Sequence, residues 1–180
     1  MNIKAQVWIE TVLYTLIAIA LIGLVLGFVT PKITDAKDKA AVEQTIDALN
    51  VVDEKINAVL DATDNIRSLD FTMKRGELLI NATDDSISFI FDDLRKPYSE
   101  PNSSINIGRV NVSSFKTQKK ISVILSLNYK NTINLTSEGL DSTKIYTEAQ
   151  IPYKFSIWNR GLVNYPLSNL NVVDIKELGG

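Results

Sequence analysis

The sequence of 180 residues contains no cysteine and no histidine, and these two absences remove much of the chemistry of enzymes. Without them the chain has no thiolate nucleophile, no imidazole base and no disulfide. Almost every zinc or copper site is excluded as well, because such sites need nitrogen or sulfur ligands. We therefore expect no cofactor, and only oxygen ligands could hold a metal.

The chain also lacks an excess of charge of one sign. It carries 19 basic and 21 acidic side chains, which gives a net charge of -2 at pH 7. Duplex binding draws much of its affinity from neutralised phosphates, so this balance gives no reason to predict a nucleic-acid partner.

Charge is absent from one long segment near the start. Val12 to Val29 comprises 18 consecutive uncharged residues, of which 15 are apolar. At helical rise this segment spans about 27 Å, close to the thickness of a bilayer core. A buried core helix is the alternative, but it would usually show a polar face, and only Tyr14 and Thr15 interrupt the run before Gly23. The pattern predicts a membrane-spanning helix.

The residues before this segment carry a second signal. Lys4 and Ala5 are followed by Gln6-Val7-Trp8-Ile9-Glu10-Thr11, and the apolar helix begins at once. No small-residue cleavage site follows the apolar run, which disfavours a secretory leader. Glu10 lies at the edge of the run, where an unpaired carboxylate entering hydrocarbon costs about 3 kcal/mol. It is either solvated at the headgroup level or in need of a partner.

This arrangement resembles the class III signal peptide of type IV prepilins, and of archaeal ones in particular. The resemblance covers about residues 1–30. It implies that a prepilin peptidase cuts between Ala5 and Gln6 on the cytoplasmic side and leaves the apolar helix attached. It also implies that Glu10, the fifth mature residue, neutralises the new amino terminus of a neighbouring subunit. Ala5 and Gln6 depart from the bacterial pattern and fit the archaeal one better.

Beyond the apolar run, Thr30-Pro31 predicts a bend or interruption, because proline lacks an amide donor and restricts the residue before it. Gly23 and Gly27 form a small-x-x-x-small pair that would let helices approach closely. The helix then resumes with a thin apolar stripe. One heptad column holds Val42, Leu49, Ile56 and Thr63, and the other holds Thr45, Val52, Val59 and Ile66.

From Ser68 onward the apolar residues alternate, which is typical of strands with one buried face. The clearest case runs from Ile121 to Tyr129. We predict a turn at 74–76 joining two strands, a bulge at Gly108-Arg109 and a turn at 159–161. About eight short strands without an intervening helix predict an antiparallel sandwich.

Four Asn-x-Ser/Thr sequences lie in this part, at Asn81, Asn102, Asn111 and Asn134. As possible N-glycosylation sites they favour a location outside the cytoplasm. The lysine count disagrees, since Lys32, Lys37 and Lys39 follow the apolar run and only Lys4 precedes it. We follow the signal-peptide resemblance and predict an external domain.

No enzymatic motif is complete, and we predict that the protein is not an enzyme. Ser113-Ser114-Phe115-Lys116 matches the S-x-x-K pattern of penicillin-binding enzymes, but the partner motifs are missing. Asp84-Asp85 and Asp92-Asp93 lack the glycine-containing spacing of a calcium loop. Solvated loops explain both pairs.

Together these features predict an α+β fold, in which a long N-terminal membrane-spanning and amphipathic helix precedes an antiparallel β-sandwich-like domain. The expected segments are a leader (1–5), a filament-core helix (6–31), an amphipathic extension (32–66) and an extracellular β domain (67–180). The expected function is that of a pilin-like structural subunit, a membrane protein before assembly and a cell-surface filament afterwards. Its partners would be the prepilin peptidase, other pilins, the pilus assembly machinery and membrane lipid.

Several alternatives stay open. The chain could instead be a permanently anchored single-span surface protein or sensor whose β domain binds a ligand. Within the pilin reading, adhesion, motility and DNA uptake are all compatible with the sequence, as are a major and a minor subunit.

Overall fold

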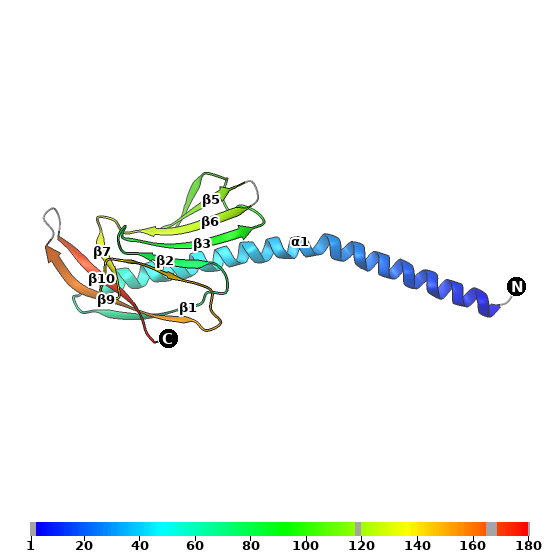
Figure 1. Ribbon diagram of the computed structural model, residues 1–180, viewed down its shortest axis with the longest axis horizontal. Helices are drawn as coiled ribbons and strands as arrows, with labels where there is room; N and C mark the ends of the chain where they lie inside the picture. Colours follow the sequence, from blue (N-terminus) through cyan, green and yellow to red (C-terminus); the bar gives the residue numbers. More distant parts are fainter. Residues whose placement is uncertain (1–2, 118–119, 165–168, 180) are drawn as a thin grey trace. The chain divides into compact units, whose positions relative to one another are not determined.

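The computed structural model describes residues 3–117, 120–164 and 169–179, with the backbone alone at 3–6 and 164. The chain divides after Lys39 into two compact units. The overall class agrees with the prediction: one long apolar N-terminal helix is followed by two sheets made mostly of antiparallel strands (Figure 1).

The helix α1 extends from Ile3 to Val59 and contains Pro31 in its interior. Of the predicted bend or interruption at Thr30-Pro31, the interruption does not occur. Proline removes one amide donor from the helix, but side chains of the neighbouring turns add hydrogen bonds to it. The Thr30 hydroxyl donates to the Leu26 carbonyl at 2.7 Å, and the Thr34 hydroxyl donates to the Thr30 carbonyl at 3.2 Å.

The end of α1 also differs from the prediction, because the helix stops at Val59 and not at Ile66. Ile66 begins strand β1, where it pairs with Trp158. Between them Asp64 adopts a left-handed conformation with φ of 63°, which a continuing helix cannot contain. The segment from Ile66, which was predicted as the end of the helix, is therefore a strand because it pairs with β9.

Within the second unit α1 buries one stripe of side chains. The predicted residues Val42, Leu49, Ile56, Val52 and Val59 are all buried, as expected. Thr45 is only half-buried, and the neighbouring Ile46 is buried instead. The reason is geometric: a straight helix repeats every 3.6 residues, so its buried stripe drifts away from a strict heptad.

The strands form two sheets. The first has the order β4-β5-β6-β3-β2-β8, and all its pairs are antiparallel. The second has the order β1-β9-β10-β7, in which β10 and β7 are parallel. The strands are β1 (Ile66–Phe71), β2 (Glu77–Asn81), β3 (Ser86–Leu94), β4 (Ser104–Ile107), β5 (Val110–Lys116), β6 (Ile121–Asn128), β7 (Ile133–Ser137), β8 (Thr143–Tyr146), β9 (Tyr153–Asn164) and β10 (Asn169–Glu177).

Three predicted connections have a different role in the structure. Residues 74–76 join strands of different sheets, because β1 pairs with β9 while β2 pairs with β3. Gly108-Arg109 is the two-residue loop of a hairpin, since Ile107 pairs with Val110, and Gly108 has the positive φ of 64° that such loops favour. Residues 159–161 form a bulge inside β9, because Asn159 and Gly161 pair with the consecutive residues Val173 and Val172.

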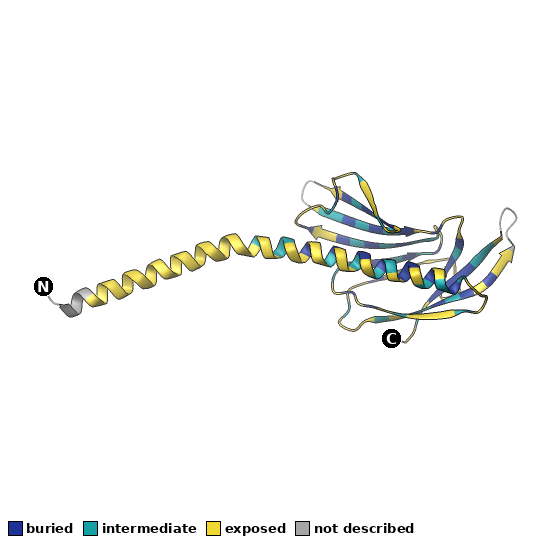
Figure 2. Ribbon diagram, turned by 180° about the vertical axis from the view of Figure 1, so that it is seen from behind, coloured by how far each residue is buried: buried dark blue, intermediate teal, exposed yellow. Residues whose placement is uncertain are grey.

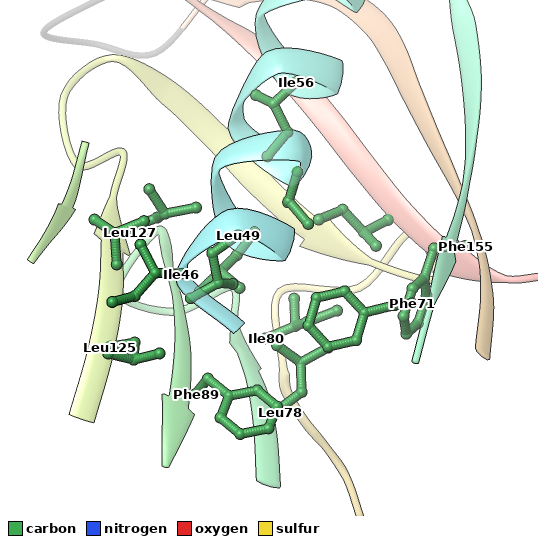
Figure 3. Packing of buried hydrophobic residues seen from close by; sticks show 14 of the residues in the cluster. Ile46, Leu49, Ile56, Phe71, Leu78, Ile80, Phe89, Leu125, Leu127 and Phe155 are labelled. Carbon is green, nitrogen blue, oxygen red and sulfur yellow. The ribbon is translucent and has the colours of Figure 1, made fainter. Parts of the chain in front are cut away.

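The hydrophobic core combines α1 with the inner faces of both sheets. Figure 3 shows Ile46 and Leu49 of α1 near Leu127 of the six-stranded sheet, and Ile56 farther along the same helix. Phe71 and Phe155 of the four-stranded sheet belong to the same cluster. The β domain is therefore not a sandwich of two sheets alone, because a helix supplies part of its core.

Candidate membrane and assembly surface

The first half of α1 exposes a continuous apolar surface. Its large side chains are mostly uncovered, with exposed fractions of 72% for Trp8, 71% for Leu24 and 68% for Phe28. Figure 2 shows this exposure along the helix. The segment is long and apolar enough to cross a membrane, and none of its most apolar window is buried. Exposed apolar surface of this extent marks a contact with lipid or with other chains.

Polar side chains within this surface are hydrogen-bonded to their own helix. The hydroxyls of Thr11 and Thr15 donate to the carbonyls of Val7 and Thr11 at 2.9 and 2.7 Å. Thr30 makes the same kind of bond one turn back. Such bonds reduce the cost of placing a hydroxyl in hydrocarbon, because the donor is satisfied inside the segment. The threonines are therefore compatible with a nonpolar environment.

Glu10 stands exposed near the beginning of this surface. Among the described residues, no hydrogen bond or ion pair reaches its carboxylate. Ala5 and Gln6, the predicted cleavage pair, lie in the helical backbone of α1, and their side chains fall outside the described residues. The chain itself thus leaves Glu10 available to a group from another molecule.

Gly23 and Gly27 are four residues apart and lie on the same side of α1. A Cβ atom built at either position would have no neighbour within 4 Å. Neither glycine is therefore required by packing within the subunit. A strip of small residues open on a helix lets a second helix approach closely.

The four predicted glycosylation sites differ in their surroundings. Asn81 caps the β2–β3 turn: its amide donates to Asp84 at 2.9 Å, and its carbonyl accepts from Thr143 at 3.1 Å. The amide of Asn111 donates to Asn106 at 2.8 Å. Asn102 is exposed and has a φ of 62°.

Asn134 has the least accessible sequon. Its threonine, Thr136, is 8% exposed, and the hydroxyl donates to the Asp174 carboxylate at 2.8 Å. Recognition of that hydroxyl by an enzyme would require β7 to open. We therefore predict no glycan at Asn134 in the folded domain.

The S-x-x-K sequence and the two aspartate pairs do not have the geometry of an enzyme site or a calcium loop in the described residues. Ser113 and Lys116 both lie in strand β5, where residues three apart point to opposite faces. The Asp85 carboxylate accepts a hydrogen bond from the Leu135 amide at 2.8 Å, and burial raises its pKa above the usual value. In the described part of the chain, no three acidic side chains form a group that could hold a metal ion.

One polar network was not predicted from the sequence. The hydroxyl of Tyr129 donates to the Asp53 carboxylate at 2.9 Å, and both side chains are buried. The Arg109 guanidinium lies 3.5 Å from the same oxygen, and Asn57 donates to the other oxygen at 3.0 Å. Burial, together with the Asp53 charge, raises the pKa of Tyr129 far above its usual value. One weak signal in the sequence points to it, because Asp53 lies between the apolar residues Val52 and Ile56 of the helix.

Comparison with known proteins adds no further information, because no family model, curated protein or solved structure matches the chain. The class that the structure defines is therefore a broad one: an α+β protein whose apolar N-terminal helix is consistent with membrane anchoring.

Proposed function

We propose that the protein is a pilin-like structural subunit of a cell-surface filament. The observation that carries the proposal is the apolar surface of α1, which is uncovered in the single chain while the same helix continues into the core of the second unit. Before assembly, the lipid of the bilayer would cover this surface. In a filament, the helices of neighbouring subunits would cover it.

Glu10 supports assembly in particular, because a simple membrane anchor has no need of a carboxylate at this position. Cleavage between Ala5 and Gln6 would create an amino terminus four residues before Glu10 in the helix. The amine of one subunit would pair with the Glu10 carboxylate of another, and this pairing would fix the axial register of the two helices. An ion pair in a low dielectric is favourable only when both partners are present, so unprocessed subunits would not form it.

The second candidate function is a permanently anchored surface protein whose β domain binds a ligand. A groove on the four-stranded sheet, lined by Trp158, Arg160 and Asp174 among others, favours this alternative. The two functions differ in processing, because an anchor has no need of the cut after Ala5.

Mass spectrometry of the intact protein, purified from membranes of the source organism, tests the proposal. We expect a mature chain that begins at Gln6. A protein that retains residues 1–5 in both membranes and surface fractions would contradict the pilin proposal and favour the anchor. Substitution of Ala5 by a bulky residue, Ala5→Leu, should block the cut, whereas Ala18→Leu inside the helix should not.

A further inference from the structure

The outer face of the four-stranded sheet carries a groove that none of the features above explains. Ile157 and Ile175 point into the core, so alternation places Trp158 of β9 and Asp174 of β10 on the opposite face. These two residues are register partners, and so are Ser156 and Lys176 beside them. Four side chains of differing chemistry therefore lie next to one another.

The turn after β7 forms the wall of this groove. The amide of Glu138 donates to the Ile175 carbonyl at 3.1 Å, and the amide of Gly139 donates to the Asp174 carboxylate at 2.6 Å. The groove has a volume of about 460 Å³, within the range of small-molecule sites. It is lined by Glu138, Gly139, Ser156, Trp158, Arg160, Asp174 and Lys176, and we call it the Trp158 groove.

Asp174 is fixed in position at the base of the Trp158 groove. Its side chain is 5% exposed, and its Oδ1 atom accepts hydrogen bonds from both Thr136 and Gly139. Its Oδ2 atom makes no hydrogen bond in the part of the chain that the structure describes. A carboxylate oxygen held in this way is an acceptor for the hydroxyl of a ligand.

Two cations and an indole complete the chemistry of the groove. The Arg160 guanidinium carbon lies 4.9 Å from the centre of the Trp158 ring, a cation–π distance. Neither Arg160 nor Lys176 forms an ion pair among the described residues. Glu138 is bonded to Lys144, and this hydrogen bond raises the pKa of Lys144. The indole N–H of Trp158 is buried and has no acceptor among the described residues.

We propose that the Trp158 groove binds an acidic saccharide, such as a uronic acid unit of a polysaccharide. One face of the indole lies against Arg160, and its remaining apolar surface is offered to a sugar ring, while Ser156 and Asp174 bond the hydroxyls of the sugar. Arg160 and Lys176 pair with its carboxylate, and the planar guanidinium suits such a group. A neutral sugar would leave both cations unpaired, so the arrangement selects acidic units. A role of this site in binding saccharides outside the cell rests on the proposed external location of the domain. The binding chemistry of the groove is independent of that location.

Tryptophan fluorescence of the full-length protein can test the proposal, because the chain contains only two tryptophans, Trp8 and Trp158. In the Trp8→Phe variant, reconstituted in nanodiscs, Trp158 is the only indole. We expect trigalacturonate to change its emission saturably, and maltotriose to have at least tenfold weaker affinity. Arg160→Gln and Lys176→Gln should each weaken binding of trigalacturonate about tenfold.

The matched control is Lys154→Gln. Lys154 lies on the same face of β9 as Trp158 but does not line the groove, so this variant should bind as the parent does. Circular dichroism should show unchanged folding for all three variants. Equal binding of maltotriose and trigalacturonate, or no saturable response, would overturn the proposal. So would a response to triaspartate or acetate at equal ionic strength, since either would mean that the groove recognises carboxylates without a sugar.

The same variants separate this proposal from the proposed function. Arg160→Gln should leave processing and filament formation intact, because Arg160 is distant in sequence from the assembly helix and exposed. Filaments without saccharide binding would contradict only the groove. Saccharide binding by a protein that is never processed would contradict only the filament.

Discussion

Asn159 of β9 donates its side-chain amide to the carbonyl of Val59, the last residue of α1, at 3.0 Å. The same amide reaches the Ala62 carbonyl at 3.0 Å, and Asn65 donates to the Ala58 carbonyl at 2.8 Å. The last carbonyls of a helix have no partner within the helix, so a side chain that binds them from outside stabilises the end. Asn159 is 1% exposed, because strand alternation places it on the same inner face of β9 as Ile157.

Replacement of Asn159 by alanine should therefore lower the free energy of unfolding by about 2 kcal/mol, because the Val59 carbonyl loses its buried side-chain donor and the Gly161 amide loses its acceptor. Chemical denaturation followed by circular dichroism would measure this loss. Asn171→Ala, in the neighbouring strand β10, serves as the control and should cost much less. Equal losses for the two variants would show that the contact between β9 and the helix end is unimportant.

Tyr129 should make the stability of the domain depend on alkaline pH. Its pKa is raised in the folded protein, so the contribution to stability is complete below about pH 10, the pKa of an unfolded tyrosine. As the pH rises above 10 the unfolded chain loses this proton first, and the folded state loses stability. Denaturation at pH 8 and pH 11 should show a smaller fall for Tyr129→Phe than for the parent. At pH 8 the variant should be about 1 kcal/mol less stable, since it lacks the bond to Asp53.

Glu10→Ala should leave cleavage and membrane insertion intact but reduce the yield of filaments. A buried amine without its carboxylate costs several kcal/mol, whereas a solvated pair is worth little. Electron microscopy and quantification of sheared filaments would measure the effect. Glu54→Ala, an exposed acid later in α1, is the matched control. Normal filament yield from the Glu10 variant would mean that Glu10 only faces the lipid headgroups.

Gly23→Leu and Gly27→Leu should be tolerated by the single subunit, because nothing lies within 4 Å of a Cβ at either position. We expect unchanged expression and thermal stability, but impaired filament formation if neighbouring helices approach along this strip. Ala20→Leu, also within the apolar segment, controls for the added volume. Normal assembly of both glycine variants would place the contact between helices on another face of α1.

The location of the domain can be tested with single cysteines, because the chain contains none of its own. Thr83→Cys introduces one exposed thiol in the β2–β3 turn. On intact cells, after removal of any surface layer, this thiol should react with a membrane-impermeant maleimide. Labelling only after lysis would reverse the orientation, in agreement with the lysines at 32, 37 and 39, and would favour a cytoplasmic sensor. Val123→Cys, fully buried in β6, controls for unfolding.

The sequence by itself determined the elements whose signal is local. The run from Val12 to Val29 predicted a membrane-spanning helix, and the structure has a helix there that is long and apolar enough to cross a membrane. The alternation from Ile121 to Tyr129 predicted β6 with its buried face. Glu10 was named from its place in the signal-peptide resemblance, and Gly23 and Gly27 from their spacing; the roles of all three stay predictions. Such elements can be predicted because each depends on the hydrophobic periodicity within a single segment, whatever that segment pairs with.

The tertiary structure decided everything that depends on which segment pairs with which. It ended α1 at Val59 because Ile66 has a strand partner, Trp158, nearly a hundred residues away. It placed β1 and β2 in different sheets, although a glycine-containing turn joins them. It also brought Asp174 beside Trp158, and Asp53 beside Tyr129. No local pattern encodes these contacts, because they arise only when distant strands compete for the same hydrogen bonds and the same core.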